Sequence, residues 1–160
     1  MSAFATGIGW DSHRLVAGRP LIIGGVTIPY ERGLAGHSDA DVLAHAIVDA
    51  LLGAAGLGDI GEHFPDTDAR WAGADSLEIL RAVAGLVAER GHAVAHVDST
   101  VVMERPKLGP HKAAIRASLA AALGIAEAQV NVKASTGEGM GFVGRGEGVA
   151  ALAVVTLARD

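Results

Sequence analysis

The sequence contains no cysteine. This absence excludes disulfides, iron–sulfur clusters and thiolate metal sites, so that any bound metal must be held by histidine or carboxylate side chains. A chain without thiols also fits a reducing compartment, and we expect a cytoplasmic protein.

Basic residues and long apolar runs are scarce as well. Lys and Arg number 13 against 18 Asp and Glu, which gives a net charge of -5. This balance gives no reason to expect nucleic acid or an anionic membrane as a partner. No apolar run approaches the ~20 residues that span a bilayer, and the first residues lack the pattern of a signal peptide. We therefore expect a soluble, unprocessed chain.

The length and the glycine content bound the architecture. The chain has 160 residues, half of them apolar, which predicts one domain over residues 1–160 with a sizeable core. Its 22 glycines cluster at 7–9, 24–25, 53–61 and 137–148. Such clusters predict tight turns or loops that approach a ligand closely.

The first segment alternates strictly between apolar and polar or small residues. The alternation predicts a strand in which Asp11 and His13 share one face, while Ile8 and Trp10 pack on the other. Further along, Gly24-Gly25 separates two short β-branched runs, which predicts a hairpin that ends at Pro29.

The remaining elements follow from periodicity and capping signals. Apolar residues at helical spacing predict a helix over 39–55, introduced by a capping box of Ser38 and Asp41, and Asp75 begins a second helix that stops at Gly91. Residues 57–73 show no period and are read as a loop. We expect strands over 93–103, 129–135 and 148–159 and a helix over 111–123. This order predicts an α/β sandwich in which helices cover a mixed β-sheet.

Three residues form a candidate metal site. Asp11 and His13 share a strand face, and His45 lies on the polar border of the first predicted helix. One carboxylate and two imidazoles match a catalytic zinc site with an open fourth position. Asp41, one turn before His45, is a candidate to orient its ring. The alternative is a structural Asp–His hydrogen bond, which is the commoner role of an isolated D-x-H pair.

Several longer motifs occur in one order over nearly the whole chain. They are "GIGWDSHR", "LIIGGVTIPYERGLAGHSDADVLAHAIVDALLGAAGLGDIGEHFPDTD", "GADS", "RPKLGPH" and "NVKASTGEGMGFVGRGEG". Together they strongly resemble the 2-C-methyl-D-erythritol 2,4-cyclodiphosphate synthases of the non-mevalonate isoprenoid pathway. The resemblance implies a homotrimer of α/β subunits with active sites between adjacent subunits. It also implies conversion of 4-diphosphocytidyl-2-C-methyl-D-erythritol 2-phosphate to the cyclic diphosphate with release of CMP.

The resemblance assigns roles to residues that match the family's motifs. It implies that Asp11, His13 and His45 hold zinc, that Glu138 holds magnesium or manganese across the substrate's diphosphate, and that His37 and Thr136 stabilise the transition state. The implied substrate-binding residues are Asp11, Ser12, His13, His37, Ser38, Asp59, Ile60, Gly61, Phe64, Pro65, Asp66, Thr67, Asp68, Met103, Glu104, Arg105, Pro106, Lys107, Leu108, Gly109, Ser135, Thr136, Gly137, Glu138, Phe142 and Arg145.

The chain departs from the family pattern in two loops. Gly137 stands where Thr or Asn is frequent, Ser135 replaces a common threonine, and residues 103–105 are larger or more charged than usual. We expect substrate binding to persist with altered loop rigidity and nucleotide affinity.

A further region matches the trimer axis of the family. Phe142, Arg145 and Glu147 correspond to a central cavity for which an isoprenoid diphosphate is the expected ligand. Arginine suits diphosphate because of its fork of donors. The alternative is a structural Arg145–Glu147 network between subunits.

Two other functions are compatible with the same residues. A zinc-dependent phosphohydrolase would use the triad to activate water and would release inorganic phosphate or a linear product. A non-enzymatic trimer would bind a cytidine nucleotide or an isoprenoid diphosphate without turnover.

Overall fold

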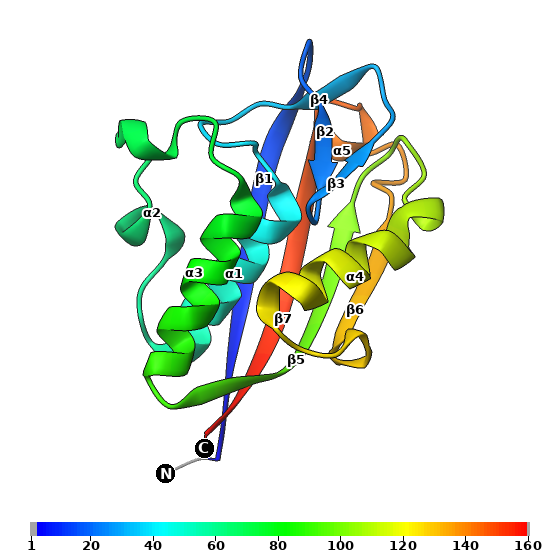
Figure 1. Ribbon diagram of the computed structural model, residues 1–160. Helices are drawn as coiled ribbons and strands as arrows, with labels where there is room; N and C mark the ends of the chain where they lie inside the picture. The colour runs from blue at the N-terminus through cyan, green and yellow to red at the C-terminus, as the bar shows by residue number, and fades with distance from the viewer. Residues whose placement is uncertain (1–2, 160) are drawn as a thin grey trace.

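A five-stranded sheet with the strand order β4-β1-β7-β5-β6 forms the centre of the molecule (Figure 1). The computed structural model describes residues 3–159. The strands of this sheet are β1 (Phe4–Ala17), β4 (Arg32–Leu34), β5 (His92–Val102), β6 (Val130–Ser135) and β7 (Gly148–Arg159). β5 and β6 are parallel and the other pairs are antiparallel, so the predicted mixed sheet is confirmed.

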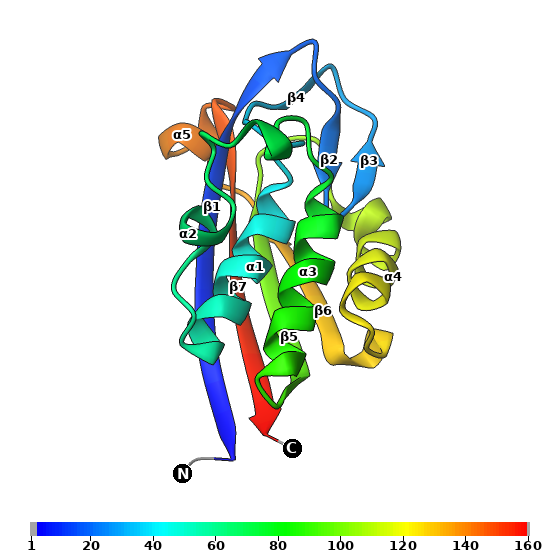
Figure 2. The ribbon, with the colours of Figure 1, turned by 60° about the vertical axis from the view of Figure 1, so that its left-hand side comes forward.

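Three long helices cover one face of this sheet (Figures 1 and 2). They are α1 (Val42–Ala55), α3 (Ser76–Glu89) and α4 (Lys112–Leu123). Their apolar sides and the inward residues of the strands form one core, which includes Ile47, Leu51, Leu80, Leu119 and Val155. The predicted single α/β domain with helices on a sheet is therefore what the chain forms.

The contact between α1 and β1 is unusually close because two glycines of β1 face the helix. A Cβ atom on Gly9 would lie 1.7 Å from the carbonyl oxygen of Ala46, and one on Gly7 would lie 2.1 Å from that of Ala50. Only residues without a side chain fit here. The two glycines thus set how deeply α1 sits on the strand.

A separate two-stranded hairpin lies between β1 and β4 along the chain. β2 (Leu21–Ile23) and β3 (Val26–Ile28) pair on either side of Gly24 and Gly25, whose φ angles of 58° and 78° fit a two-residue turn that favours glycine. The predicted hairpin and its end before Pro29 are confirmed.

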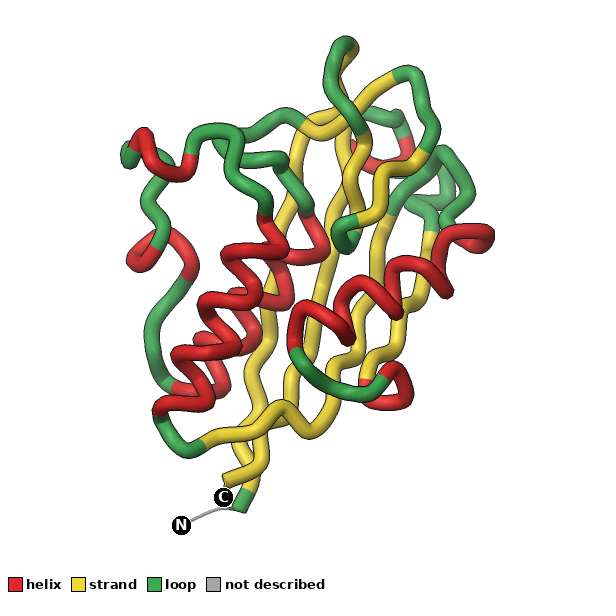
Figure 3. Tube along the Cα trace, viewed as in Figure 1, coloured by secondary structure: helices red, strands yellow, loops and turns green. Residues whose placement is uncertain are grey.

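The periodicity of apolar residues in the sequence does not predict the short helices, turns and strands. Residues 57–73 were expected to be a loop, but they contain α2 (Ile60–His63) and the 3-10 turn η1 (Ala69–Trp71). Neither is long enough to produce a repeating apolar pattern. The same holds for β4, for α5 (Gly141–Gly144) and for the 3-10 turns η2 (Gly109–His111) and η3 (Glu127–Gln129). Most long loops lie at the end of the sheet away from both termini (Figure 3).

The expectation that Ile8 and Trp10 are packed is wrong for the single chain. Ile8 is 69% exposed and Trp10 is 52% exposed, because their side of the sheet is the one that the three long helices leave uncovered. Val154 pairs with Ile8 across β7 and is also exposed. We call five exposed apolar side chains the outer patch: Ile8, Trp10 and Val154 on this face, and Met140 and Phe142, which border one cavity together with Trp10.

Within residues 3–159, no helix is both long enough and apolar enough to cross a membrane.

The glycine contact predicts that Gly9→Ala is strongly destabilising. The added methyl group meets backbone of α1, which cannot rotate away, so we expect a loss of at least ~3 kcal/mol in the free energy of unfolding, the upper end of the cost of overpacking. Urea denaturation measures it. The matched control is Gly85→Ala inside α3, where nothing lies within 4 Å of the added atom and a gain of ~0.5–1 kcal/mol is expected. A Gly9→Ala chain as stable as wild type would contradict the close contact.

Candidate functional site

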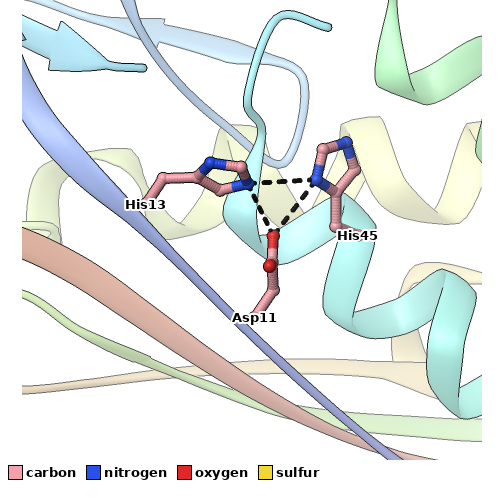
Figure 4. Close-up of side chains that lie close together, drawn as sticks. All are labelled: Asp11, His13 and His45. Atoms are coloured by element: carbon pink, nitrogen blue, oxygen red, sulfur yellow. Dashed lines mark hydrogen bonds and ion pairs between the residues drawn. The ribbon is translucent and has the colours of Figure 1, made fainter. Parts of the chain in front are cut away.

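The sheet and α1 bring Asp11, His13 and His45 together (Figure 4). Asp11 and His13 project from the helix-facing side of β1, and His45 lies in the first turn of α1. Asp11 Oδ2 is 2.8 Å from His13 Nε2 and 3.1 Å from His45 Nδ1, and the two ring nitrogens are 3.3 Å apart. One ligand atom from each residue lies within 4.8 Å of the others. The spacing-based grouping of these three residues is therefore correct.

The His13 ring is held in one orientation by the backbone. Its Nδ1 is 2.8 Å from the carbonyl oxygen of Ala35, which can only accept, so Nδ1 carries a proton and donates it. In the neutral ring the lone pair is then on Nε2, the atom that faces Asp11. A carboxylate oxygen and a ring lone pair at 2.8 Å repel each other unless a proton or a metal ion lies between them.

The pKa values of Asp11 and His13 reflect how closely these two side chains approach each other. Burial raises the pKa of Asp11, but hydrogen bonds and charge from His13 and His45 outweigh it, and the net pKa lies below its usual value. Burial lowers the pKa of His13, but the hydrogen bond and the charge of Asp11 raise it by more, so the net pKa lies above its usual value. Both directions show that this position favours a positive charge beside Asp11.

The donor set fits a divalent metal ion. Two imidazole nitrogens and one carboxylate oxygen, part-buried and converging on one point, are ligands that zinc accepts in catalytic sites, where three protein ligands leave a position for substrate. The structural Asp–His alternative accounts for the Asp11–His13 contact alone. It does not account for the second ring nitrogen that points to the same place.

A cavity of about 250 Å³ opens beside the triad. His13 and His45 form part of its wall, and several of the residues assigned to substrate binding form much of the rest. In its wall, the ring of Phe64 packs edge-on against that of Trp71, with 4.8 Å between the ring centroids. His37 Nε2 lies 3.0 Å from the carbonyl oxygen of Asp68. The wall is formed by His13, Gly36, His37, Ser38, His45, Ile60, Phe64, Asp66, Trp71 and Ile79.

Two expectations at the start of α1 are wrong. Ser38 does not cap the helix; Asp41 does, through the backbone N–H of Ala44. Asp41 does not orient His45 either, since its carboxylate also accepts the N–H groups of Gly24 and Gly25 at 2.8 and 2.7 Å. Burial raises the pKa of Asp41 to about 6 against these hydrogen bonds. Asp41 thus anchors the hairpin to the helix.

A second cavity, of about 340 Å³, lies where β5 and β6 end. It collects most of the expected nucleotide loop together with Ser135, Thr136 and Glu138. Glu104 links the loop of residues 103–109 to the loop of residues 136–139, because its carboxylate accepts the N–H groups of Gly137 and Gly139 at 2.9 and 3.3 Å. The wall is formed by Met103, Pro106, Lys107, Leu108, Gly109, Lys112, Ala134, Ser135, Thr136 and Glu138.

At Gly137 the backbone packs too closely to admit a side chain. A Cβ atom there would lie 2.7 Å from the backbone nitrogen of Gly144, so the loop packs directly on α5. The next residue, Glu138, has φ 53°, which is uncommon for a residue with a side chain. The Thr136 hydroxyl accepts the Glu138 N–H at 3.2 Å and supports this turn.

The two cavities share no wall residue. The triad belongs to β1 and α1, whereas the second cavity lies at the ends of β5 and β6, and β7 separates β1 from β5 in the sheet. One chain therefore brings together each half of the expected site but leaves the halves apart.

Most of the other assigned residues lie in loops, whereas Ser12 lies in β1, Gly61 in α2 and Phe142 in α5. Asp59 caps α2 through the Glu62 N–H, and Asp68 caps η1. The hydrogen bond from Arg70 lowers the pKa of the exposed Asp68 carboxyl. No wall of the two cavities above includes Asp11, Ser12, Asp59, Gly61, Pro65, Thr67, Asp68, Glu104, Arg105, Gly137, Phe142 or Arg145.

The region expected at a trimer axis contains an ion pair within the chain. Arg145 Nε lies 3.1 Å from Glu147 Oε1, and the contact lowers the pKa of Glu147. Phe142 and Glu147 border a small cavity of about 210 Å³ together with Ser12, His13 and Arg14.

Five residues at or behind the first cavity were not predicted from the sequence. Gly36, Trp71 and Ile79 contribute to its wall, and Ser76 and Asp39 lie behind His45. Ser76 belongs to the "GADS" motif, but a serine beside the helix cap Asp75 also reads as an ordinary helix start. Only the spatial arrangement distinguishes a serine that merely begins a helix from one whose hydroxyl contacts His45.

Known proteins share this sequence and fold over nearly their whole length. Residues 4–158 match the YgbB family. A 2-C-methyl-D-erythritol 2,4-cyclodiphosphate synthase of Symbiobacterium thermophilum is 61% identical over 152 residues, which is 95% of this chain and 97% of the relative. One of Burkholderia thailandensis is 60% identical, covering 98% of this chain and 97% of the relative. A solved 2C-methyl-D-erythritol-2,4-cyclodiphosphate synthase in a CDP-bound form superposes with a TM-score of 0.87 at 43% identity, over 95% of this chain and 99% of that one.

The triad predicts that His45→Ala removes high-affinity zinc binding. We expect one zinc ion per wild-type chain and an affinity loss in the variant that exceeds the ~10–100-fold typical of residues one step removed from a metal. Chelator competition measures the affinity and elemental analysis the stoichiometry. His63→Ala is the matched control, because His63 bonds to the carbonyl oxygen of Leu57 outside the triad. Equal zinc affinity in both variants would contradict the assignment.

Proposed function

The chain belongs to the YgbB family, and on this premise we propose that it converts 4-diphosphocytidyl-2-C-methyl-D-erythritol 2-phosphate into 2-C-methyl-D-erythritol 2,4-cyclodiphosphate and CMP. The observation that carries the proposal is the convergence of Asp11, His13 and His45 at the edge of a cavity. Relatives at about 60% identity bear the name of that synthase. The reaction places the enzyme among phosphorus–oxygen lyases, and residues 1–160 form its single catalytic domain.

The proposed step is an intramolecular phosphoryl transfer. An oxygen of the 2-phosphate forms a bond to the β-phosphorus, and the bond from that phosphorus to the oxygen it shares with the α-phosphate breaks. CMP leaves with this oxygen and with the electron pair of the broken bond. Such a step needs alignment of the two phosphates and stabilisation of charge rather than covalent help from the protein.

In this proposal Asp11, His13 and His45 hold zinc, or another divalent metal in its place, and Glu138 holds magnesium or manganese. Bound cations of this kind supply Lewis-acid stabilisation of phosphoryl oxygens. Support for the first site comes from its three converging ligand atoms. Support for the second is the carboxylate of Glu138, which an unusual backbone conformation presents at the wall of the second cavity beside Thr136.

The remaining assigned residues would orient the substrate. His37 has its ring fixed by the Asp68 carbonyl, and we assign to it and to Thr136 the hydrogen bonds that strengthen as the phosphorus becomes pentacoordinate. Phe64 and Asp66, at the first cavity, suit the methylerythritol part. The loop of residues 103–109 at the second cavity suits the cytidine.

We propose that a homotrimer joins the two halves of the site across subunit interfaces. The triad cavity and the nucleotide cavity lie on strands that β7 separates, so a complete site needs the second half from a neighbouring copy. The outer patch supports this assembly, because exposed Ile8 and Trp10 on an uncovered sheet face, with Phe142 beside Trp10, are typical of an interface. Phe142, Arg145 and Glu147 would then line a central cavity suited to an isoprenoid diphosphate.

Phosphorus NMR tests the proposed reaction directly. The purified protein with zinc, magnesium and the substrate should produce CMP and the cyclic diphosphate in equal amounts. Asp11→Asn should lose turnover, because it removes a metal ligand, while His63→Ala should retain it. Release of inorganic phosphate would instead indicate a phosphohydrolase. A zinc-loaded protein that binds CDP but leaves the substrate unchanged would indicate a binding module.

The outer patch predicts that Ile8→Glu dissociates the trimer. Ile8 is 69% exposed in one chain, so the substitution should leave the fold intact and place a charge in the interface. Sedimentation should show three chains per particle for wild type and one for the variant. Ala114→Glu is the control, because this exposed position lies on α4 over the other face of the sheet. A trimeric Ile8→Glu protein would contradict this interface.

A further inference from the structure

A buried hydrogen-bond network lies behind His45, on the side away from Asp11 and His13. His45 Nε2 is 2.8 Å from the hydroxyl oxygen of Ser76, the first residue of α3. Ser76 is fully buried. Its hydroxyl contacts Asp39, which belongs to the segment that precedes α1. The network therefore links the starts of two helices to one ring nitrogen.

The proton of the Ser76 hydroxyl is committed to Asp39. Asp39 Oδ1 accepts it, and Asp39 Oδ2 accepts the backbone N–H of the same serine at 3.0 Å. Asp39 Oδ1 also accepts the Asp41 N–H at 3.1 Å. A carboxylate that is surrounded by donors has only acceptor oxygens to offer. The serine hydroxyl consequently has no second proton to give.

This direction determines the proton on His45. Since the Ser76 oxygen can only accept from the ring, Nε2 of His45 must carry the proton. The lone pair of the neutral ring is then on Nδ1, which lies 3.1 Å from Asp11 Oδ2 and 3.3 Å from His13 Nε2. The Ser38 hydroxyl oxygen lies 3.2 Å from Nε2 and accepts the Ala40 N–H. Its own proton has a separate acceptor, the Ser76 oxygen at 3.5 Å.

We propose that Ser76 and Asp39 are positioning residues that select the His45 tautomer able to bind a metal through Nδ1. His13 is set in the opposite tautomer by the Ala35 carbonyl, so the two histidines bind through different ring nitrogens because their outer partners differ. This inference rests on the metal site of the proposed function. Neither residue lines the first cavity. Asp41, which the sequence suggested for this role, is bonded to the hairpin instead.

The test compares two buried serines. Ser76→Ala removes the acceptor for His45 Nε2–H, and we expect zinc affinity to fall ~10–100-fold, the usual effect of removing such a partner. Ser99→Ala is the matched control: Ser99 is 2% exposed and its hydroxyl donates to the Asn131 carbonyl, remote from the triad. We expect its zinc affinity to equal that of wild type. Chelator competition on the folded proteins, without substrate, gives these values.

A second readout follows the tautomer itself. In the metal-free wild type, nitrogen-15 NMR of the histidine rings should show His45 protonated at Nε2, and in Ser76→Ala it should show both tautomers. Asp39→Asn is the second variant, and it replaces Ser76→Ala if that protein folds poorly. It keeps the size of the side chain but removes a carboxylate oxygen as acceptor, so it should cause the same two changes.

The outcomes separate this inference from the proposed reaction. Wild-type zinc affinity and an unchanged His45 tautomer in both variants would overturn the positioning role, even in an enzyme that releases CMP. A wild-type chain that binds no zinc would overturn the metal site itself, and the positioning role with it. Weaker zinc binding in Ser76→Ala alone, with Ser99→Ala unchanged, is the result expected from the network.

Discussion

The backbone-to-backbone contact of α1 with β1 is the constraint on which the site depends. Gly7 and Gly9 let the helix approach until a single added methyl group would overlap the carbonyls of Ala50 and Ala46. Ala46 is adjacent to His45, and Gly9 is two residues from Asp11. The depth of this contact therefore fixes how far His45 lies from the two ligands on the strand, and a bulkier strand would hold the helix too far away for one ion to reach all three.

Around that contact, fixed hydrogen-bond partners determine what the ligands can do. A backbone carbonyl orients His13, and the buried Ser76 hydroxyl faces the far nitrogen of His45. Burial lowers the pKa of His13, but the hydrogen bond and the charge of Asp11, which lies where the two rings meet, outweigh it and raise that pKa. Asp41, by contrast, serves the fold, because it joins the hairpin turn to the first turn of α1.

Much of this could be predicted from the sequence because the signals are local or periodic. The hairpin, the three long helices and the long strands followed from alternation, helical spacing and glycine positions, and the shared face of Asp11 and His13 followed from parity alone. The short elements between residues 57 and 73 produce no period. The helix cap was misassigned because Ser38 and Asp41 both suit that role. Asp41 was misassigned as a partner of His45 because the sequence does not show that its carboxylate instead binds the amide groups of the hairpin. The exposure of Ile8 and Trp10 could not be predicted either, since an apolar strand face reads the same whether a helix or another chain covers it.

The separation of the two cavities by β7 has a consequence for how the protein would behave as a population of chains. Each chain in the proposed trimer lends its metal ligands to one reaction centre and its nucleotide loop to another. Two chains damaged in different halves can then restore one intact centre when they assemble together, although neither works by itself. Dilution far enough to separate the subunits would abolish turnover in molecules that remain fully folded.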